Sequence, residues 1–485
     1  MDALRMYIGG RWVDSVSRAT YQARSPASGE MIATLPEGTR EDAQRAIAAA
    51  REGTERLARL SVWERAKLCA RVADVLERRK DELARTLTLD QGKPLHSEAK
   101  AEVDATVAGW RNAADHVKWL ETSVIPVEDP HKRVLTIRQA RGVYAVITPW
   151  NFPLNIPTEY LAPGLAAGNA MVWVPAPTTS VVAVKLVECL EEAEVPAGAI
   201  NLVTGPGPVV GDEIVAHAGT DAVAFTGSSA TGEHIARRAA GKPLLLELGG
   251  NGPTLILDDA NLEQAANAAA FGAFFNAGQV CSAAERILVH RSVHDEVANR
   301  LVDHATHIQL GDPFDERTQM GPLNNQPVAE KTDRHLADAL ARGAKVLAGG
   351  SRARGWPTDL YYQPTVLTGV ARDAMINREE TFGPVAPLIP FQTDEEALAW
   401  ANDSTLGLVS AVFTRDLSRA FWFAERLRTG IVNVNDSTNY WELHIPFGGV
   451  AGKRSGVGRL GGRHTLYEMT DLRTICLDVR RLDQG

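Results

Sequence analysis

The sequence predicts an α/β protein built on parallel β-sheets with helices on both faces. Between residues 143 and 250, short apolar runs alternate with helical segments, which is the pattern of a parallel sheet. The alternation continues less regularly through residues 255–430. At 485 residues the chain is too long for one hydrophobic core, so two α/β domains in series fit its length.

Composition narrows the class of protein. A hydrophobic content of 45% and a charged content of 23% are ordinary for a soluble protein. The formal charge of −9 disfavours nucleic acid and anionic membranes as partners. No apolar run approaches the roughly 20 residues that span a bilayer, and the N-terminus has no signal-peptide core. We therefore expect neither a nucleic-acid nor a membrane partner.

Four cysteines, at positions 69, 189, 281 and 476, are scattered along the chain. Their spacing fits neither a disulfide framework nor a zinc site, so we expect no bound metal. A reducing, cytoplasmic setting fits this usage best. Such a setting would also keep a thiol nucleophile active.

Residues 36–120 read as mostly helical. Thr39 followed by Asp42 predicts a helix N-terminus ahead of the Ala-rich segment 43–60. A second helix is predicted over residues 62–80. Residues 131–141 then alternate like a partly exposed strand, and residues 143–147 read as a buried one.

The following elements carry the alternation. We expect strands at 170–174, 199–203, 222–225 and 243–247, and helices at 180–193, 209–216 and 231–240. Later strands are expected at 254–257, 287–290, 345–348 and 410–413. The tail from Asp471 alternates like a strand, and its partner is either the strand near residue 133 or another subunit.

Cys281 stands apart from the other cysteines, because Gly, Ser, Gln and Asn surround it in residues 275–283. A thiol acts as a nucleophile when it is reachable and can become a thiolate, and small polar neighbours allow both. The local sequence supports an inert, buried thiol as well as it supports a nucleophile. Cys69 and Cys189 lie in helix-like segments and read as inert core.

Two polar residues follow predicted buried strands. Glu247 ends an apolar run and precedes two glycines, so it is either a general base with a raised pKa or half of a structural ion pair. Asn151 lies between Pro149 and Pro153 in a rigid segment. A rigidly held amide suits an oxyanion donor, although a lone Asn more commonly caps a loop.

Two glycine-containing turns are candidates for binding a nucleotide phosphate. The segment 205–211 spells an imperfect dinucleotide fingerprint, and two prolines stiffen it. The segment 225–228, Phe-Thr-Gly-Ser, follows a strand and opens a helix, where free backbone N–H groups favour a phosphate. We prefer the second, in which Ser228 is also a helix N-cap candidate.

Taken in order, these motifs resemble the aldehyde dehydrogenase superfamily. The resemblance covers nearly the whole chain and rests on residues 7–12, 148–153, 225–228, 246–251, 278–283, 379–384, 446–449 and 455–459. It implies two Rossmann-like parallel-sheet domains plus a small β oligomerisation flap. Residues 1–121 and 141–249 would form the nucleotide-binding domain, 250–453 the catalytic domain, and 122–140 with 468–485 the flap. A homodimer or homotetramer is expected.

The resemblance also implies a mechanism. The Cys281 thiolate attacks an aldehyde, and the Asn151 amide with the Cys281 backbone N–H holds the oxyanion. Hydride leaves to the cofactor, and Glu247 activates the water that hydrolyses the thioester. The alternatives are a CoA-acylating relative, in which CoA takes the acyl group, and a non-catalytic NAD(P)-binding member.

The implied cofactor is NAD or NADP. The resemblance places it against Ile147, Thr148, Pro149, Trp150, Pro175, Pro177, Gly207, Phe225, Thr226, Gly227, Ser228, Leu248, Glu380 and Phe382. The chain departs from the family at Val174, where a Lys is usual, and at Pro177, where a Glu is frequent. Both ribose contacts are then lost, and so is the repulsion of a 2′-phosphate, which leaves the choice between NAD and NADP open.

Three residues are expected at the substrate pocket: Glu159, Tyr440 and Trp441. Family members that oxidise carboxylate-bearing semialdehydes often have an Arg where Glu159 stands. Glu159 argues against an anionic substrate and suits a polar or cationic one, unless it pairs with a structural Lys or Arg. The rings of Tyr440 and Trp441 suit aromatic or medium aliphatic aldehydes. Leu460 replaces a second Glu that some members carry, so Glu247 would act without that relay.

Overall fold

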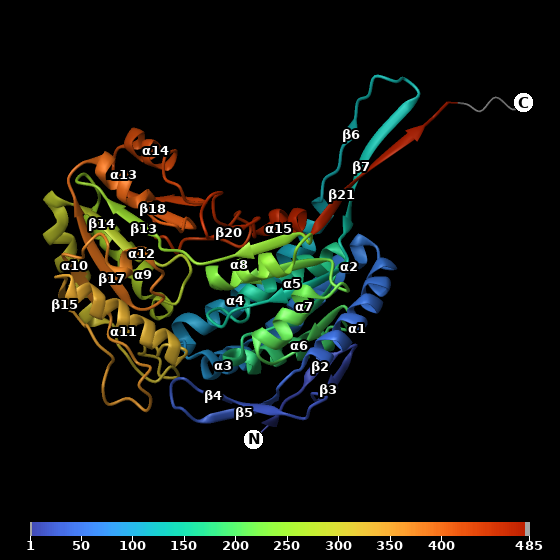
Figure 1. Cartoon of the computed structure of the whole chain (residues 1–485), viewed down its shortest axis with the longest axis horizontal. Helices are drawn as coiled ribbons and strands as arrows, with labels where there is room; N and C mark the ends of the chain where they lie inside the picture. The colour runs from blue at the N-terminus through green and yellow to red at the C-terminus, as the bar shows by residue number, and fades with distance from the viewer. Residues whose placement is uncertain (1, 481–485) are drawn as a thin grey trace, which may run out of the picture.

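The structure, a computed structural model, describes residues 2–480. Two large β-sheets flanked by helices form the body, and a narrow three-stranded sheet projects from it (Figure 1). The α/β class predicted from the alternating pattern is confirmed.

The first large sheet has eight strands in the order β20-β12-β11-β8-β9-β10-β2-β3. Its strands are β2 (Met6–Ile8), β3 (Arg11–Val13), β8 (Val143–Ile147), β9 (Ala170–Val174), β10 (Ile200–Leu202), β11 (Ala222–Thr226), β12 (Leu244–Glu247) and β20 (Gly456–Val457). The five central strands, β12 to β10 in this order, run parallel, so their carboxyl ends share one edge. Ligands of open α/β sheets bind at such an edge.

Helices cover both faces of this sheet. They are α1 (Arg40–Ala58), α2 (Val62–Arg78), α3 (Lys80–Gln91), α4 (Lys100–His116), α5 (Asn155–Ala167), α6 (Ser180–Glu192), α7 (Asp212–Ala216) and α8 (Ser229–Arg238). The predicted N-cap of α1 is confirmed, because Thr39 and Asp42 exchange hydrogen bonds as a capping box.

The second large sheet has seven strands in the order β15-β16-β17-β14-β13-β18-β19, of which only the edge strand β15 is antiparallel to its neighbour. They are β13 (Pro253–Ile256), β14 (Arg286–His290), β15 (Lys345–Ala348), β16 (Thr365–Thr368), β17 (Val385–Phe391), β18 (Val409–Phe413) and β19 (Ile431–Val434). The chain passes from the first sheet to the second between Glu247 and Pro253. The domain boundaries given above stay predictions.

The helices of this second half are α9 (Leu262–Phe274), α10 (His294–His307), α11 (Gln326–Ala341), α12 (Met375–Arg378), α13 (Asp394–Asn402) and α14 (Leu417–Ala424). A further helix, α15 (Gly462–Glu468), returns to the first half and packs on α5. None of the helices within residues 2–480 is long and apolar enough to cross a membrane.

The projecting sheet joins β7 (Lys132–Ala140) with β6 (Val124–Ile125) and β21 (Thr470–Asp478) (Figure 1). The tail therefore pairs with the strand near residue 133 of the same chain, one of its two predicted partners, and the register runs from Thr470 opposite Ala140 to Asp478 opposite Lys132. Val124 and Leu472 expose 78% and 55% of their surface on this sheet. Residues 481–485 of the predicted flap lie outside the described residues. A small sheet of β1 (Asp2–Ala3), β5 (Met31–Pro36) and β4 (Thr20–Arg24) completes the fold.

Candidate active site

Two cavities meet at Cys281. A cavity of about 220 Å³ opens toward the carboxyl edge of the first sheet, and its wall includes Trp150, Ser228 and Glu380. A second cavity of about 500 Å³ has a wall that includes Glu247. Cys281 belongs to both walls, so a group bound in either cavity can reach the thiol. We call them the cofactor cavity and the substrate cavity, after the predicted sites that they contain.

The backbone around Cys281 is tightly packed. Asn276 and Ala277, in the turn after α9, have positive φ angles of 51° and 54°, which non-glycine residues rarely adopt. A Cβ on Gly250 would lie 1.9 Å from the carbonyl oxygen of Cys281. Glycine is therefore required beside the cysteine, which explains one of the two glycines that follow Glu247.

The electrostatic setting of the thiol differs from the expectation that its small polar neighbours would favour a thiolate. Burial raises the pKa of Cys281 well above its usual value, and the carboxylates of Glu380, Glu247 and Glu159 raise it further. These surroundings favour the protonated form of the thiol over the thiolate. A positive charge nearby would reverse this by stabilising the thiolate.

Asn151 is held rigidly beside Cys281. Its side-chain Nδ2 donates a hydrogen bond to the backbone carbonyl of Gln279 at 3.0 Å. The backbone carbonyl of Asn151 accepts from Lys93 Nζ at 2.9 Å and from Asn276 Nδ2 at 3.1 Å. One of the two N–H bonds on Nδ2 is thus used, and the other remains for a ligand. The backbone N–H of Cys281 has no acceptor among the described residues. These two donors are the predicted oxyanion pair.

Glu247 ends β12 and is buried, with 3% of its surface exposed. Neither carboxylate oxygen has a hydrogen-bond partner within residues 2–480. Burial raises its pKa well above the usual range, the nearby Glu159 adds to this, and Arg459 opposes it. A Cβ on Gly448 would lie 2.9 Å from Glu247 Oε1, so this glycine leaves room at the carboxylate. Glu247 thus forms no direct ion pair with any described residue, which is not what the ion-pair interpretation requires.

Glu159 lies on α5 in the wall of the substrate cavity. Its carboxylate accepts one side-chain hydrogen bond, from Asn155 Nδ2 at 3.1 Å, and forms no ion pair with a described Lys or Arg. Burial raises its pKa to about 8. The alternative of a structural ion pair is therefore not what the structure contains.

The cofactor cavity gathers eight of the predicted cofactor residues: Pro149, Trp150, Thr226, Gly227, Ser228, Leu248, Glu380 and Phe382. Ser228 caps α8 by accepting from the N–H of Thr231, as expected. Because Gly227 and Ser228 at this helix end line the cavity, the N–H groups of the first turn suit a phosphate bound there. Glu380 accepts from the N–H of Gly250 at 3.0 Å. A helix N-terminus and a fixed carboxylate fit the pyrophosphate and a ribose hydroxyl of a dinucleotide.

The other six predicted cofactor residues do not line this cavity: Ile147, Thr148, Pro175, Pro177, Gly207 and Phe225. Ile147 and Phe225 lie in parallel strands of the first sheet, Thr148 and Pro175 directly follow strands, and Pro177 and Gly207 lie in the loops after β9 and β10. Thr148 accepts from the indole of Trp173 at 2.9 Å. Pro177 and Gly207 are exposed, and Phe225 and Pro175 are buried. Gly207 opens a π-helical turn ahead of α7.

The residue at the usual Lys position, Val174, ends β9 and exposes 1% of its surface. Lys185 does not substitute for that Lys, because its Nζ pairs with Glu188 at 2.9 Å and contacts Glu82. Residues 174–177 thus present no charged side chain at this edge of the sheet.

Aromatic rings form part of the substrate cavity. Trp441 lines it and packs edge-on against Phe447, with ring centroids 5.5 Å apart. Phe152 and Phe275 lie across from each other at 6.1 Å. Tyr440 does not line the cavity: it is 46% exposed, and its hydroxyl donates to Glu442 at 2.9 Å. Of the two aromatic residues expected at the substrate pocket, Trp441 thus lines the cavity and Tyr440 does not.

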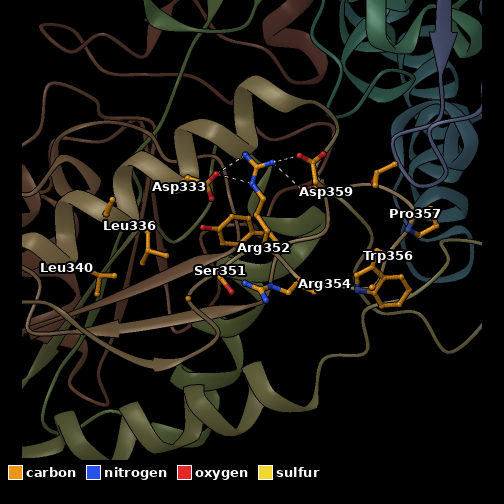
Figure 2. Close-up of a pocket in the computed structure, with 15 residues that line it drawn as sticks. Asp333, Leu336, Leu340, Ser351, Arg352, Arg354, Trp356, Pro357 and Asp359 are labelled. Carbon is orange, nitrogen blue, oxygen red and sulfur yellow. Dashed lines mark hydrogen bonds and ion pairs between the residues drawn. The ribbon is translucent and has the colours of Figure 1, made fainter.

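A separate hollow of about 700 Å³ lies beside α11 in the second half (Figure 2). Arg352 reaches into it and pairs with Asp333 and Asp359, at 2.7 and 2.9 Å, so its charge is neutralised. No cysteine is among the described residues that line this hollow, and the carboxylates of Asp333 and Asp359 are paired with Arg352. It therefore lacks the thiol and the unpaired carboxylate that the cavities around Cys281 contain.

Three site residues were not predicted from the sequence. Glu285 anchors the turn that carries Glu380 and Phe382, and Gln279 holds Asn151. Lys331 lines the cofactor cavity, with its Nζ 5.7 Å from the centre of the Phe382 ring. Glu285 comes two residues after the motif at 278–283 and directly before β14. A buried acidic residue next to a strand is the signal that could have identified it.

Comparisons with known proteins agree with this geometry. The model of the "Aldehyde dehydrogenase family" matches residues 12–475. The chain is 37% identical to the glutarate-semialdehyde dehydrogenase of Pseudomonas putida, over 98% of this chain and 97% of that one. It is also 37% identical to the NADP(+) succinate-semialdehyde dehydrogenase of Escherichia coli, over 97% of each chain.

Solved structures give the same result. A crystal structure of an NADP-dependent enzyme of E. coli has a TM-score of 0.95 and 36% identity, over 98% of each chain. The betaine aldehyde dehydrogenase of Staphylococcus aureus, solved with NAD+, has a TM-score of 0.95 and 37% identity, over 99% of this chain and 96% of that one. The chain therefore belongs to the aldehyde dehydrogenase family, as an NAD(P)-dependent oxidoreductase that acts on aldehydes.

Proposed function

We propose that Cys281, Asn151 and Glu247 carry out a hydrolytic oxidation of an aldehyde to a carboxylate. The observation that carries this proposal is the position of Cys281 at the junction of two cavities, with the unpartnered Glu247 carboxylate in one and the α8 N-terminus in the other. A nucleophile, a base and a nucleotide site are thus within reach of one bound aldehyde.

The chain's own residues account for each bond that changes. The Cys281 thiol loses its proton to solvent, and the thiolate sulfur forms a bond to the aldehyde carbon. The C=O π bond opens, and its oxygen becomes an oxyanion between Asn151 Nδ2 and the Cys281 N–H. NAD(P)+, when bound, supplies the acceptor for the hydride that leaves this carbon, and a thioester on Cys281 remains. Glu247 takes a proton from water, the hydroxide adds to the thioester, and the carbon–sulfur bond breaks to release the carboxylate.

Positioning follows from the fixed groups of the cofactor cavity. The carboxylate of Glu380 suits the ribose next to the nicotinamide, and the ring of Phe382 packs edge-on against Trp150 at 5.5 Å. Rigid placement of this kind matters, because a hydride is transferred only over a short distance. Glu247 supports water as the acyl acceptor, since a CoA thiol would need no such base.

The test is a steady-state assay of the purified protein on a broad panel of aldehydes, with and without CoA. Formation of NAD(P)H together with free carboxylate in the absence of CoA is the expected result. A turnover that requires CoA would overturn the hydrolytic mechanism. Binding of NAD(P) without oxidation of any aldehyde would favour the non-catalytic alternative.

Both NAD and NADP are proposed as cofactors. Residues 174–177 lack a cation to attract a 2′-phosphate and a carboxylate to repel it. The relatives named above include an NADP(+) enzyme and one solved with NAD+. We expect the kcat/KM values for the two cofactors to agree within about tenfold, which is 1.4 kcal/mol. A ratio above a thousand would contradict this.

The protein is further proposed to be a cytoplasmic homodimer or homotetramer, assembled through the flap of β6, β7 and β21. The exposed apolar residues Val124 and Leu472 support this, because such residues on a projecting sheet favour association. Light scattering should show a multiple of 52.4 kDa, and Leu472→Glu should shift it toward the monomer. A monomeric wild-type protein would overturn the proposal.

A further inference from the structure

We propose that the substrate of this enzyme is an aldehyde whose far end carries a cationic nitrogen, held by Glu159 and the aromatic wall of the substrate cavity. The proposal rests on the proposed function, because it assigns the other end of the molecule that Cys281 attacks. It differs from the relatives named for glutarate and succinate semialdehydes, whose substrates carry a carboxylate.

The wall of the substrate cavity is acidic. Its acidic residues are Glu98, Glu102, Glu159, Glu247 and Glu442, and none of the described residues that line it is a lysine or an arginine. Among the described residues of the wall, His444 alone can gain a positive charge, and it is exposed to solvent. The cavity therefore offers an anionic substrate no buried cationic partner.

Three of these carboxylates are already accounted for. Glu102 pairs with the buried Lys93 at 2.6 Å, and its other oxygen accepts from the N–H groups of Leu154 and Asn155. Glu98 accepts from the N–H of Asn276 at 3.0 Å through one oxygen, and the positive charge of the nearby buried Lys93 stabilises its carboxylate. Glu442 is exposed and accepts from Tyr440. Glu247 is assigned to water activation, and only Glu159 remains.

Glu159 has no charge partner of its own. Its one side-chain contact is the neutral amide of Asn155, and an ionised carboxylate in such a site carries an uncompensated desolvation cost. Burial accordingly raises the pKa of Glu159. An ammonium group in the cavity would offset the cost by a direct ion pair, whereas a second carboxylate would increase it.

The aromatic residues of the wall suit the same ligand. Phe152, Phe275, Trp441 and Phe447 line the cavity that contains Glu159. Aromatic faces attract cations, and trimethylated ammonium groups are commonly bound by such rings. The protein itself places an ammonium on one of them, since Lys93 Nζ lies 4.0 Å from the centre of the Phe152 ring. A carboxylate would gain nothing from these faces.

Pairs of substrates that differ only in charge test the assignment. The aldehyde 3-aminopropanal matches butanal in size, and trimethylammonioacetaldehyde matches 3,3-dimethylbutanal. Succinate semialdehyde is the anionic comparison. We expect kcat/KM for each cation to exceed that of its neutral counterpart by about tenfold or more, which corresponds to 1.4 kcal/mol. Succinate semialdehyde should be the poorest substrate of the five.

Variants at Glu159 connect the preference to this side chain. The readout is the cation-to-neutral ratio of kcat/KM, so a general change in activity cancels. In Glu159→Gln the ratio should fall toward one, and in Glu159→Lys the ranking should reverse in favour of succinate semialdehyde. Glu395→Gln is the control: this exposed carboxylate on α13 does not line the substrate cavity, so the ratio should change less than about twofold.

The outcomes separate this proposal from the proposed function. Equal or better oxidation of butanal and 3,3-dimethylbutanal, or a preference for succinate semialdehyde, would overturn the cationic assignment while leaving the dehydrogenase mechanism intact. A cation preference that survives Glu159→Gln would overturn the role of Glu159. Absence of turnover with all five aldehydes and with the broader panel would instead count against the proposed function.

Discussion

The backbone N–H of Phe382 donates a hydrogen bond of 2.6 Å to the carboxylate of Glu285, which lies 97 residues earlier in the chain. The other carboxylate oxygen accepts from the N–H of Thr381 at 2.9 Å and from Asn251 Nδ2 at 3.1 Å. Phe382 has a positive φ of 59°, a conformation that needs support from its surroundings. Glu285 therefore fixes the turn that presents Glu380 and Phe382 to the cofactor cavity.

Replacing this anchor should weaken cofactor binding. In Glu285→Ala two N–H groups lose their acceptor, and each buried unsatisfied donor costs about 1–3 kcal/mol. Since the turn then relaxes, we expect the dissociation constants for NAD and NADP to rise about tenfold or more, with a smaller change in kcat. Quenching of tryptophan fluorescence measures the binding, and Trp150 in the cavity wall supplies a reporter.

The control for this prediction is Glu395→Ala, which removes an exposed carboxylate from α13. Its cofactor affinity should equal that of the wild type. If Glu285→Ala also binds both cofactors with wild-type affinity while remaining folded, the turn does not depend on Glu285.

Asn151→Ala tests the oxyanion donor. The substitution removes Nδ2, and loss of one such donor costs about 2.7–4 kcal/mol in other enzymes, or a factor of about 10²–10³ in kcat. We expect a loss of this size in kcat, together with a smaller effect on KM. Because Nδ2 also donates to Gln279, circular dichroism and thermal unfolding should accompany the kinetics. A kcat within fivefold of the wild type in a folded variant would remove Asn151 from the mechanism.

The pH dependence of the thiol follows from its surroundings. Burial and nearby carboxylates raise the pKa of Cys281, so the reactive thiolate is gained only as the pH rises. In protein without cofactor, the rate of alkylation by iodoacetamide should increase about tenfold per pH unit from 7 to 9 without levelling off, since even an ordinary thiol has a pKa of about 8.5. The Cys476→Ser background removes the exposed second thiol.

A plateau of the alkylation rate below pH 8 would contradict the raised pKa. The alkylation rate in the presence of NAD+ tests the pKa of Cys281 in a second way. The positive charge of the oxidised nicotinamide, placed in the cofactor cavity, should stabilise the thiolate and increase the rate at pH 7.5.

The first sheet was predictable because its strands are buried on both faces. Parallel strands of this kind appear as continuous apolar runs, and residues 143–147, 170–174 and 222–225 all formed strands as expected. In the second sheet, β17 was missed. It contains Pro387 and Pro390, which cannot donate to a ladder and argue against a central strand, yet β17 lies between β16 and β14.

The site residues show a similar division. Cys281, Glu247 and Asn151 were identifiable because each follows a distinctive local pattern, although the cysteine alone was ambiguous. Glu285 was missed, because its partners Thr381 and Phe382 become neighbours only when β14 and the turn before β17 meet. Whether Glu159 has a cationic partner also depends on residues far away in the chain. No local pattern could decide it.

The most direct test of the central claim uses Glu247→Gln, mixed with NAD(P)+ and an aldehyde and analysed by intact mass and by peptide mapping. If Glu247 activates the water that hydrolyses a thioester on Cys281, one equivalent of NAD(P)H should form in a burst and turnover should then be slow. The protein should gain the mass of the aldehyde minus two hydrogens, located on the peptide that contains Cys281. A burst without this adduct, an adduct on another residue, or wild-type turnover would contradict the account.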